Sequence, residues 1–386
     1  MRTAIWLIGV YFGLAISCPA QGVNTYHMGN SLTWDARVSQ GLPSLSADAG
    51  FEHDTGHHIR CGKPLDYMVN NPEDVCISSN QFGLYSDALV NSEWDAVTLQ
   101  PHTGSTPQLE LAAIQAIVAI AHQNPANTDT RFYIYATWPD QPMSGQVFGD
   151  IWFDTALGTS TDPFARVQSN FQWILDELRS EPSVADTTFF YIPGGEVLAE
   201  LDDRMRDGQI PGFTDVSMLY RDSIHLSNVG RFVAANTFFA TLFGQDPTGL
   251  PVNNKFNLSP NWDNQFPITA TLAATIQQVV WEVVRNHPDT LIPLLGDADN
   301  DRLVTGADLV SIQQNFSTAG LANGVLIGDA NDDGFVTGTD IISVQQNFAS
   351  VATVQLAPVP EPTSVTMLSV AFGILLRTQG RPRRHS

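Results

Sequence analysis

Residues 23–33 read VNTYHMGNSLT, and this stretch decides the fold class. Its first part, from Val23 to Met28, is a short apolar run of the kind that forms a buried strand. The turn Gly29-Asn30-Ser31 follows directly, so the serine hydroxyl is expected at the edge of a sheet. The sequence therefore predicts a polar, reactive side chain at the carboxyl end of the first strand.

Strand and helix patterns alternate from residue 21 to about residue 287. Apolar runs predict strands at 96–99, 132–136 and 188–192, with a weaker one at 58–61. Helical periodicity is present at 109–122, 164–178, 197–205, 229–243 and 269–285. This alternation predicts an α/β domain whose parallel sheet is covered by helices on both faces. Ligands bind such sheets at the carboxyl ends of the strands.

Composition and net charge limit the classes of molecule that the chain can bind. The chain has 386 residues, of which 43% are hydrophobic, so it can bury a sizeable core and is not disordered throughout. Its 40 acidic and 18 basic residues give a net charge of -22. A chain this negative repels phosphates, which disfavours nucleic acids and anionic lipids as partners.

A candidate base for Ser31 lies far along the chain, where residues 222–230 read DSIHLSNVG. A serine is a poor nucleophile until a base takes its proton. Asp222 is spaced to reach Nδ1 of His225, which leaves Nε2 for the serine. Ser31, Asp222 and His225 are therefore the predicted catalytic residues.

Together these two blocks resemble the GDSL/SGNH hydrolases over nearly all of residues 21–245. The first block is Gly29-Asn30-Ser31-Leu32, with Asn where the name-giving motif has Asp, and the last is Asp222-x-x-His225. The resemblance implies a flavodoxin-like three-layer α/β/α sandwich over residues 21–290. It also implies an esterase in which the serine is the nucleophile, the histidine the base and the aspartate its orienter, with no cofactor for catalysis.

The same resemblance implies an oxyanion hole. Its donors would be the backbone amide of Ser31, the amide of Gly62 after the second strand, and a side-chain amide after the third. Gln100 stands where the family has Asn. Trp34 and Trp138 are placed either to stack against a sugar or to pack in the core.

An internal repeat lies near the C-terminus. DADNDRLVTGAD, from Asp297, recurs as DANDDGFVTGTD, from Asp329. Oxygen ligands at positions 1, 3, 5, 9 and 12, with a backbone carbonyl at position 7, are the pattern that binds calcium. The two predicted structural calcium ions would be held by Asp297, Asp299, Asp301, Leu303, Thr305 and Asp308, and by Asp329, Asn331, Asp333, Phe335, Thr337 and Asp340.

A pair of half EF-hands with Asp at position 12 resembles a type I dockerin domain, here over residues 291–350. Position 6 is Gly334 in the second loop but Arg302 in the first, so the first site is expected to bind calcium more weakly. The resemblance implies docking to a cohesin-like partner. Dockerins resemble parts of systems that handle polysaccharides, which makes carbohydrate esters the expected substrates, with lipid and aryl esters as alternatives.

Both ends of the chain resemble targeting signals. Residues 1–20 have the charged, apolar and small-residue layout of a secretory signal peptide, with an alternative lipid-anchored start at Cys18. In 351–386, Pro360-Glu361-Pro362 precedes an apolar segment and a basic tail. This order resembles a PEP-CTERM sorting signal, which implies an exosortase-type processing enzyme and export to the envelope or surface of a Gram-negative bacterium. An ordinary tail anchor is the alternative.

Two further questions stay open at the level of sequence. Cys61 and Cys76 either pair in a disulfide, which suits an exported protein, or are free thiols. The chain is either an esterase or a non-catalytic surface protein that binds glycan and docks through its calcium module.

Overall fold

The computed structural model describes residues 22–155, 163–257, 265–290, 292, 294–299, 301, 303–319, 326–331 and 334–349. The predicted signal peptide and the predicted sorting segment lie outside these ranges. None of the helices in the described ranges is both long enough and apolar enough to span a membrane.

Five parallel strands form the sheet of the large domain. Its order is β2-β1-β3-β4-β5, and the strands are β1 (Thr25–Gly29), β2 (Thr55–Ile59), β3 (Ala96–Leu99), β4 (Arg131–Tyr135) and β5 (Phe189–Ile192). Every residue of β1 and β3 is buried, as expected for central strands that are covered on both faces. The predicted α/β class with a parallel sheet is confirmed, and the strand order is that of flavodoxin-like folds.

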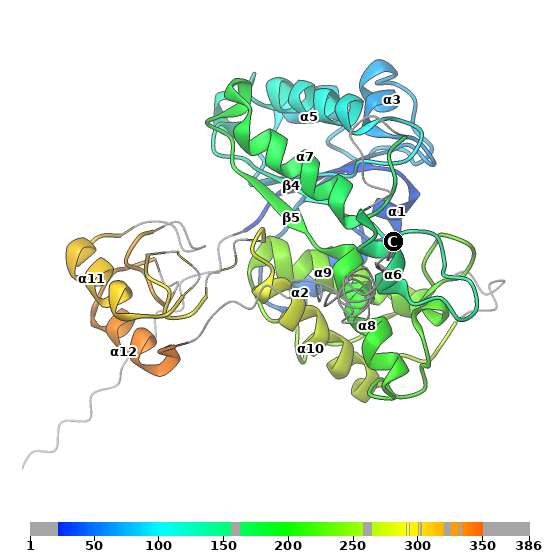
Figure 1. Cartoon of the computed structure of the whole chain (residues 1–386). Helices are drawn as coiled ribbons and strands as arrows, with labels where there is room; N and C mark the ends of the chain where they lie inside the picture. Colours follow the sequence, from blue (N-terminus) through cyan, green and yellow to red (C-terminus); the bar gives the residue numbers. More distant parts are fainter. Residues whose placement is uncertain are drawn as a thin grey trace, which may run out of the picture. The chain divides into compact units, whose positions relative to one another are not determined.

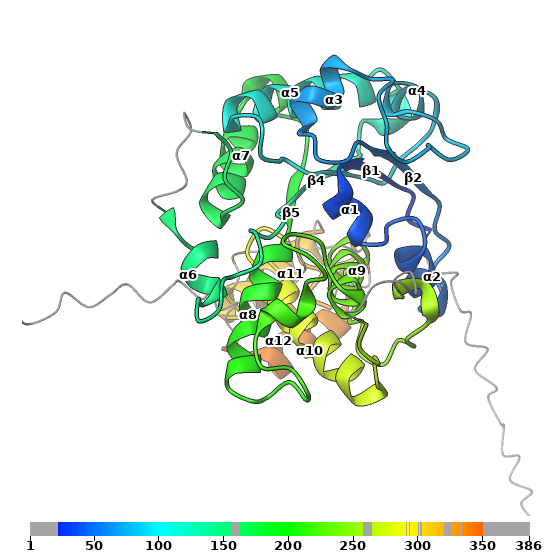
Figure 2. The same ribbon diagram turned by 90° about the vertical axis from the view of Figure 1, so that its right-hand side faces the viewer.

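Helices form a layer on each face of this sheet (Figures 1 and 2). One layer contains α3 (Leu65–Asn70), α4 (Tyr85–Asn91), α5 (Pro107–Ala121) and α7 (Gln168–Ser180). The other contains α2 (Gly41–Asp48), α8 (Gly194–Arg206), α9 (Asn228–Phe243) and α10 (Ala270–Asn286). Two short helices, α1 (Ser31–Asp35) and α6 (Phe148–Trp152), follow β1 and β4.

The sequence prediction missed some local structure. The strand expected at 58–61 lies at Thr55–Ile59, where Gly56 packs so closely on Tyr26 that an added Cβ would come within 2.4 Å of the ring. This close tertiary contact overrides the low strand propensity of glycine. The helices α1, α2, α3, α4 and α6 were not predicted, because segments of five to eight residues show too little periodicity to be recognised.

Residues 294–349 form a second, separate buried cluster. It contains Leu294 and three pairs of equivalent residues from the two repeats: Ala298 and Ala330, Val304 and Val336, Ile312 and Val344. The helices α11 (Gly306–Asn315) and α12 (Gly338–Asn347) carry the last pair and pack against each other. Each repeat thus supplies half of a small shared core.

Candidate active site and candidate cation loops

The end of β1 presents Ser31 as the first residue of α1. Asn30 caps this helix by accepting a hydrogen bond from the Leu32 amide (3.0 Å). Gly29 is required by close packing, since an added Cβ would lie 2.2 Å from Oγ1 of Thr33 and 2.7 Å from Oε1 of Gln100. This turn, which we call the nucleophile turn after the predicted role of Ser31, is therefore fixed both by its own cap and by the loop after β3.

Ser31, His225 and Asp222 meet in the folded chain. Oγ of Ser31 lies 2.9 Å from Nε2 of His225, across 194 residues of sequence. Nδ1 of His225 lies 3.0 Å from each carboxylate oxygen of Asp222. These are hydrogen-bond distances, so the serine, the imidazole and the carboxylate form one connected chain of polar groups.

The Asp222 carboxylate is held in its charged form. Partial burial acts to raise its pKa, but hydrogen bonds from the backbone amides of His225 (2.8 Å) and Ile224 (3.0 Å) and the contact with the imidazole outweigh this effect and lower the pKa. A charged acceptor on Nδ1 fixes the tautomer in which Nε2 of His225 is free to accept a proton.

The 222–225 loop is anchored on several sides. Nε1 of Trp138 donates to the carbonyl of Ile224 (2.7 Å), and the amide of Gln141 donates to the carbonyl of Ser223 (2.8 Å). Ser227 caps α9 two residues after His225. Of the two roles open to Trp138, packing is the observed one, because its side chain is buried. Trp34 is half-buried, with its ring 5.3 Å from that of His57.

Gln100 is fully buried and contacts the nucleophile turn directly. Its Oε1 accepts from the amides of Asn30 (3.0 Å) and Thr33 (3.1 Å) and from Oγ1 of Thr33 (2.6 Å). Since backbone amides only donate, the atom facing them must be the oxygen. Nε2 of Gln100 is buried and has no hydrogen-bond partner within the described part of the chain.

The other predicted oxyanion residue, Gly62, lies in a turn just after β2. Its φ of 64° is in the left-handed region, which glycine adopts without strain. The next residue, Lys63, accepts a hydrogen bond from Nδ2 of Asn30 through its carbonyl (3.3 Å). The Gly62 loop is thereby tied to the nucleophile turn.

A disulfide also holds this loop. It joins Cys61 and Cys76 and closes a segment that contains Gly62. The Cys76 amide donates to the carbonyl of Ile59 in β2 (3.0 Å).

Two carboxylates that the sequence reasoning missed support the site. Glu110 of α5 accepts from the amides of Leu65 (3.1 Å), Asp66 (3.0 Å) and His102 (3.1 Å), and so connects the start of α3 with the loop after β3. Burial raises its pKa to about 7. Asp35, in α1, bonds to residues on either side of the 222–225 loop. Neither belongs to a recognisable motif, and both have their partners elsewhere in the sequence.

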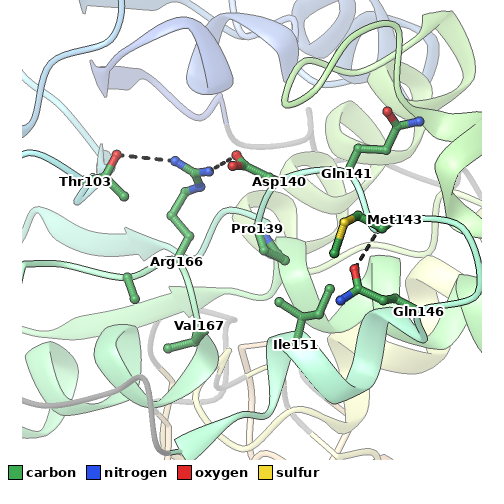
Figure 3. Close-up of a pocket in the computed structure, with 10 residues that line it drawn as sticks. Thr103, Pro139, Asp140, Gln141, Met143, Gln146, Ile151, Arg166 and Val167 are labelled. Carbon is green, nitrogen blue, oxygen red and sulfur yellow. Dashed lines mark hydrogen bonds and ion pairs between the residues drawn. The ribbon is translucent and has the colours of Figure 1, made fainter.

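A pocket of about 350 Å³ is shown in Figure 3, and one of its lining residues, Gln141, donates its amide to the carbonyl of Ser223 in the 222–225 loop (2.8 Å). Arg166 donates to the carbonyl of Trp138 (2.9 Å) and to Oγ1 of Thr103 (3.4 Å), and it forms an ion pair with Asp140. The guanidinium is therefore fixed and its charge is compensated. The lining residues are Thr103, Pro139, Asp140, Gln141, Met143, Gln146, Ile151, Ala165, Arg166 and Val167.

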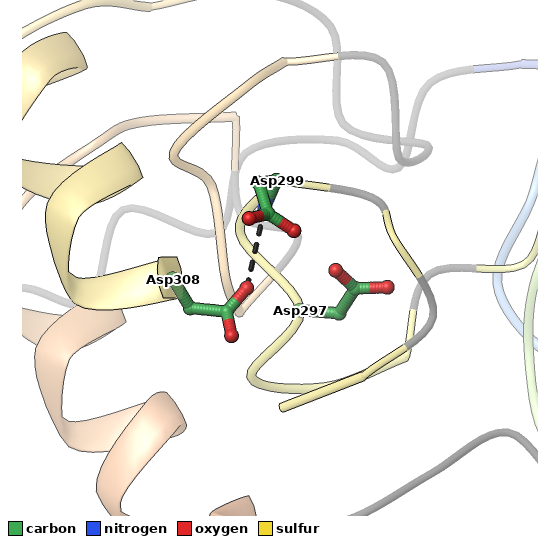
Figure 4. A group of neighbouring side chains, drawn as sticks. All are labelled: Asp297, Asp299 and Asp308. Carbon is green, nitrogen blue, oxygen red and sulfur yellow. Dashed lines mark hydrogen bonds between the residues drawn. The ribbon is translucent and has the colours of Figure 1, made fainter. Parts of the chain in front are cut away.

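Acidic side chains of the first repeat loop converge (Figure 4). Carboxylate oxygens of Asp297, Asp299 and Asp308 lie within 4.8 Å of one another. Asp308 is oriented by the amides of Ala298 (2.7 Å) and Thr305 (2.6 Å). Burial, and next the charge of Asp308, raise the pKa of Asp299. This repulsion and the all-oxygen donor set fit a hard divalent cation.

Backbone amides also hold the other carboxylates of the two loops. The Asp301 amide donates to Asp297 (3.1 Å), and the amide of Leu303 donates to Asp301 (2.8 Å). Thr305 and Thr337 are the N-caps of α11 and α12. In the second loop, Asp340 accepts hydrogen bonds from the amides of Ala330 (2.8 Å), Asn331 (3.1 Å) and Thr337 (2.7 Å). Asp329 accepts a hydrogen bond from the Gly334 amide (2.7 Å). The Phe335 side chain is exposed. Asp333 lies outside the described residues.

No protein-family model and no curated protein matches the chain. Among solved structures, it is similar to a DUF4886 family protein from Bacteroides uniformis, at 18% identity and a TM-score of 0.44, over 69% of this chain and 96% of that one. It is also similar to a gut microbial diltiazem-metabolizing enzyme, at 15% identity and a TM-score of 0.34. That match covers 57% of this chain and 46% of the other.

Proposed function

We propose that the chain is a serine hydrolase of the SGNH type that cleaves ester bonds. The observation that carries this proposal is the hydrogen-bonded series from Ser31 through His225 to Asp222, with 2.9 Å between the hydroxyl and the imidazole. This arrangement is the one by which a weak nucleophile is activated for acyl transfer.

In the proposed reaction, Oγ of Ser31 attacks the ester carbonyl while its proton passes to Nε2 of His225. The negative charge on the carbonyl oxygen is stabilised by the backbone amides of Ser31 and Gly62 and by Nε2 of Gln100. The C–O bond to the alcohol then breaks, and His225 returns the proton to the leaving oxygen. Water then attacks the acyl carbonyl while Nε2 of His225 takes its proton. The bond to Oγ of Ser31 breaks, His225 returns the proton to Oγ, and the acid is released.

We propose carbohydrate esters such as acetylated polysaccharides as the substrate class. The pocket beside the 222–225 loop offers both apolar surface and side-chain amides, which suits a sugar ring with its hydroxyl groups. The calcium module and the sorting signal proposed for this chain resemble parts of systems that act on polysaccharides.

Turnover of p-nitrophenyl acetate tests the proposal. Ser31→Ala is expected to lower kcat by about 10³-fold or more, since it removes the attacking atom. Ser46→Ala serves as the matched control, because Ser46 is a buried serine in α2 whose hydroxyl donates to the carbonyl of Pro43 (3.0 Å). Equal rates for wild type and Ser31→Ala would refute the hydrolase and leave the non-catalytic glycan-binding alternative.

We further propose that residues 291–350 form a dockerin-like module with two structural calcium ions. Asp297, Asp299 and Asp308 would hold the first ion, as their convergence favours. The ion would supply the positive charge that offsets the repulsion between carboxylates. Isothermal titration of the full chain should detect two calcium ions per chain, and one fewer for Asp308→Asn. The exposed acid Asp186, changed to Asn, is the control. An absence of calcium binding by the wild type would refute this assignment.

Exposed apolar side chains support a docking role for this module. They occur at equivalent positions of the two repeats: Leu295 and Ile327, Leu303 and Phe335, Val310 and Ile342, Phe316 and Phe348. Exposed apolar surface of this extent favours a protein partner, for which we propose a cohesin-like domain. Pull-down with a panel of cohesin domains tests the proposal, and a panel without any binder would contradict it.

We also propose that the chain is exported to the envelope or surface of a Gram-negative bacterium and processed by an exosortase-type enzyme. The Cys61–Cys76 disulfide supports an oxidising destination. Fractionation of cells that express the full chain tests the location, and recovery from the cytoplasm alone would contradict it.

A further inference from the structure

We propose that Asp35 is a positioning residue that keeps the nucleophile helix and the 222–225 loop aligned. This inference rests on the proposed function, in that it concerns how Ser31 and His225 are held together. Asp35 lies four residues after Ser31 in α1, about one helical turn. Its side chain is 1% exposed, so its carboxylate is held by protein groups and not by water.

Four donor atoms surround the Asp35 carboxylate. Nη1 of Arg221 lies 2.9 Å from Oδ1, and Nε and Nη2 of Arg231 lie 3.0 Å and 2.8 Å from it. The backbone amide of Leu226 donates to Oδ2 (2.9 Å). Both carboxylate oxygens are therefore engaged, by donors that are 186 to 196 residues away in sequence.

These donors lie at both ends of the segment that carries the acid and the base. Arg221 immediately precedes Asp222, and Leu226 immediately follows His225. Arg221 also donates to the carbonyl of Leu226 (3.0 Å), and its amide donates to the carbonyl of His225 (2.8 Å), so the two ends of the loop are joined to each other as well. Asp35 thus fixes the closed loop to α1 at both its entry and its exit.

The alignment has a direct chemical consequence. Ser31 and His225 belong to the same two elements that Asp35 joins, and their reacting atoms are 2.9 Å apart. Displacement of a reacting group by about 1 Å costs on the order of 10²-fold in rate. Loss of the Asp35 carboxylate would also leave the partly buried Arg231 and Arg221 to repel each other, while the longer contact of Arg221 with Asp222 (3.7 Å) remains.

The test compares Asp35→Asn with Asp202→Asn in the full chain. Asp202 is a matched control, because it is fully buried, pairs with Arg206 (2.8 Å) and accepts from the amides of Phe148 (2.9 Å) and Val216 (2.8 Å). On p-nitrophenyl acetate, Asp35→Asn should lower kcat by about 10²-fold with KM nearly unchanged. Asp202→Asn should lose stability but keep kcat within about threefold.

A second readout does not depend on turnover. The proton on Nδ1 of His225, bonded to Asp222, should give a downfield ¹H NMR signal whose position depends on the hydrogen bond between Nε2 of His225 and Ser31. Asp35→Asn should shift this signal, and Asp202→Asn should leave it in place. A wild type that shows this signal but no esterase activity refutes the proposed function and leaves the positioning role to be decided by NMR. If folded Asp35→Asn leaves the signal at its wild-type position, or if both variants shift it alike, the positioning role is overturned.

If Asp35→Asn does not fold, Arg231→Gln takes its place, since it leaves Arg221 paired with Asp35 and removes only one of the two cations. It is expected to lower kcat by about tenfold and to shift the His225 signal by less than is expected for Asp35→Asn. A folded Arg231→Gln protein with wild-type kcat and an unchanged signal would overturn the positioning role.

Discussion

Two substitutions separate the observed contacts of Gln100 with the nucleophile turn from its proposed role in the oxyanion hole. Gln100→Ala removes the oxygen that accepts from the amides of Asn30 and Thr33 and from the Thr33 hydroxyl. The hydroxyl can turn to another acceptor, but the two buried amides cannot, and each costs about 1–3 kcal/mol when left unpaired. We therefore expect a loss of about 4 kcal/mol in the free energy of unfolding, which corresponds to roughly 10 °C in Tm for a domain of this size.

Gln100→Glu keeps the accepting oxygen and replaces the Nε2 donor with a second oxygen. The nucleophile turn should then keep more of its stability than in Gln100→Ala. If Nε2 stabilises the oxyanion, kcat should fall by about 10²–10³-fold, the usual effect of removing one such donor. Thermal denaturation and p-nitrophenyl acetate kinetics on wild type and both variants give the two quantities.

Each role can fail independently. A Gln100→Ala protein with the wild-type Tm would show that the hydrogen bonds to the turn contribute little to stability. A Gln100→Glu protein with wild-type kcat would show that Nε2 does not stabilise the oxyanion, and the hole would then consist of the backbone amides of Ser31 and Gly62.

Two further predictions concern pH and calcium. Burial raises the pKa of Glu110 from 4.5 to about 7, so the folded state favours its protonated form. The contribution of Glu110 to the free energy of unfolding is thus largest below pH 4.5 and falls by about 3 kcal/mol as the pH rises through 7. Denaturation curves at several pH values should show this decline for the wild type and not for Glu110→Gln. Removal of calcium with EDTA should lower the melting temperature of residues 294–349, measured from the NMR signals of Val304 and Val336. Excess calcium should restore that temperature. A melting temperature that EDTA leaves unchanged would contradict the calcium assignment.

Much of the fold was predictable because its signals are local. The apolar strands that begin near Val23 and Ala96 are visible as short runs between polar segments. The pairing of Ser31 with Asp222 and His225 was predictable for another reason, since the Gly29-Asn30-Ser31 turn and the Asp222-x-x-His225 spacing together resemble the two end blocks of a known hydrolase family.

The sequence did not predict the structural roles of Asp35, Glu110 and the side-chain oxygen of Gln100. Each acts on backbone amides or cations far along the chain, and no spacing rule connects residues that tertiary structure alone brings together. An isolated acidic residue in a helix is normally expected on the surface, whereas Asp35 and Glu110 are buried. The sequence also showed the Cys61 and Cys76 side chains without showing whether they approach each other.

The bond between Cys61 and Cys76 matters to anyone who prepares this protein. It closes a 15-residue stretch around Gly62, and a cross-link of that span contributes about 3 kcal/mol. Dithiothreitol in a purification buffer, or production in a reducing host compartment, would release that stretch while the parallel sheet stayed intact. A folded preparation that fails to turn over an ester should therefore have its thiols counted before the proposed esterase activity is rejected.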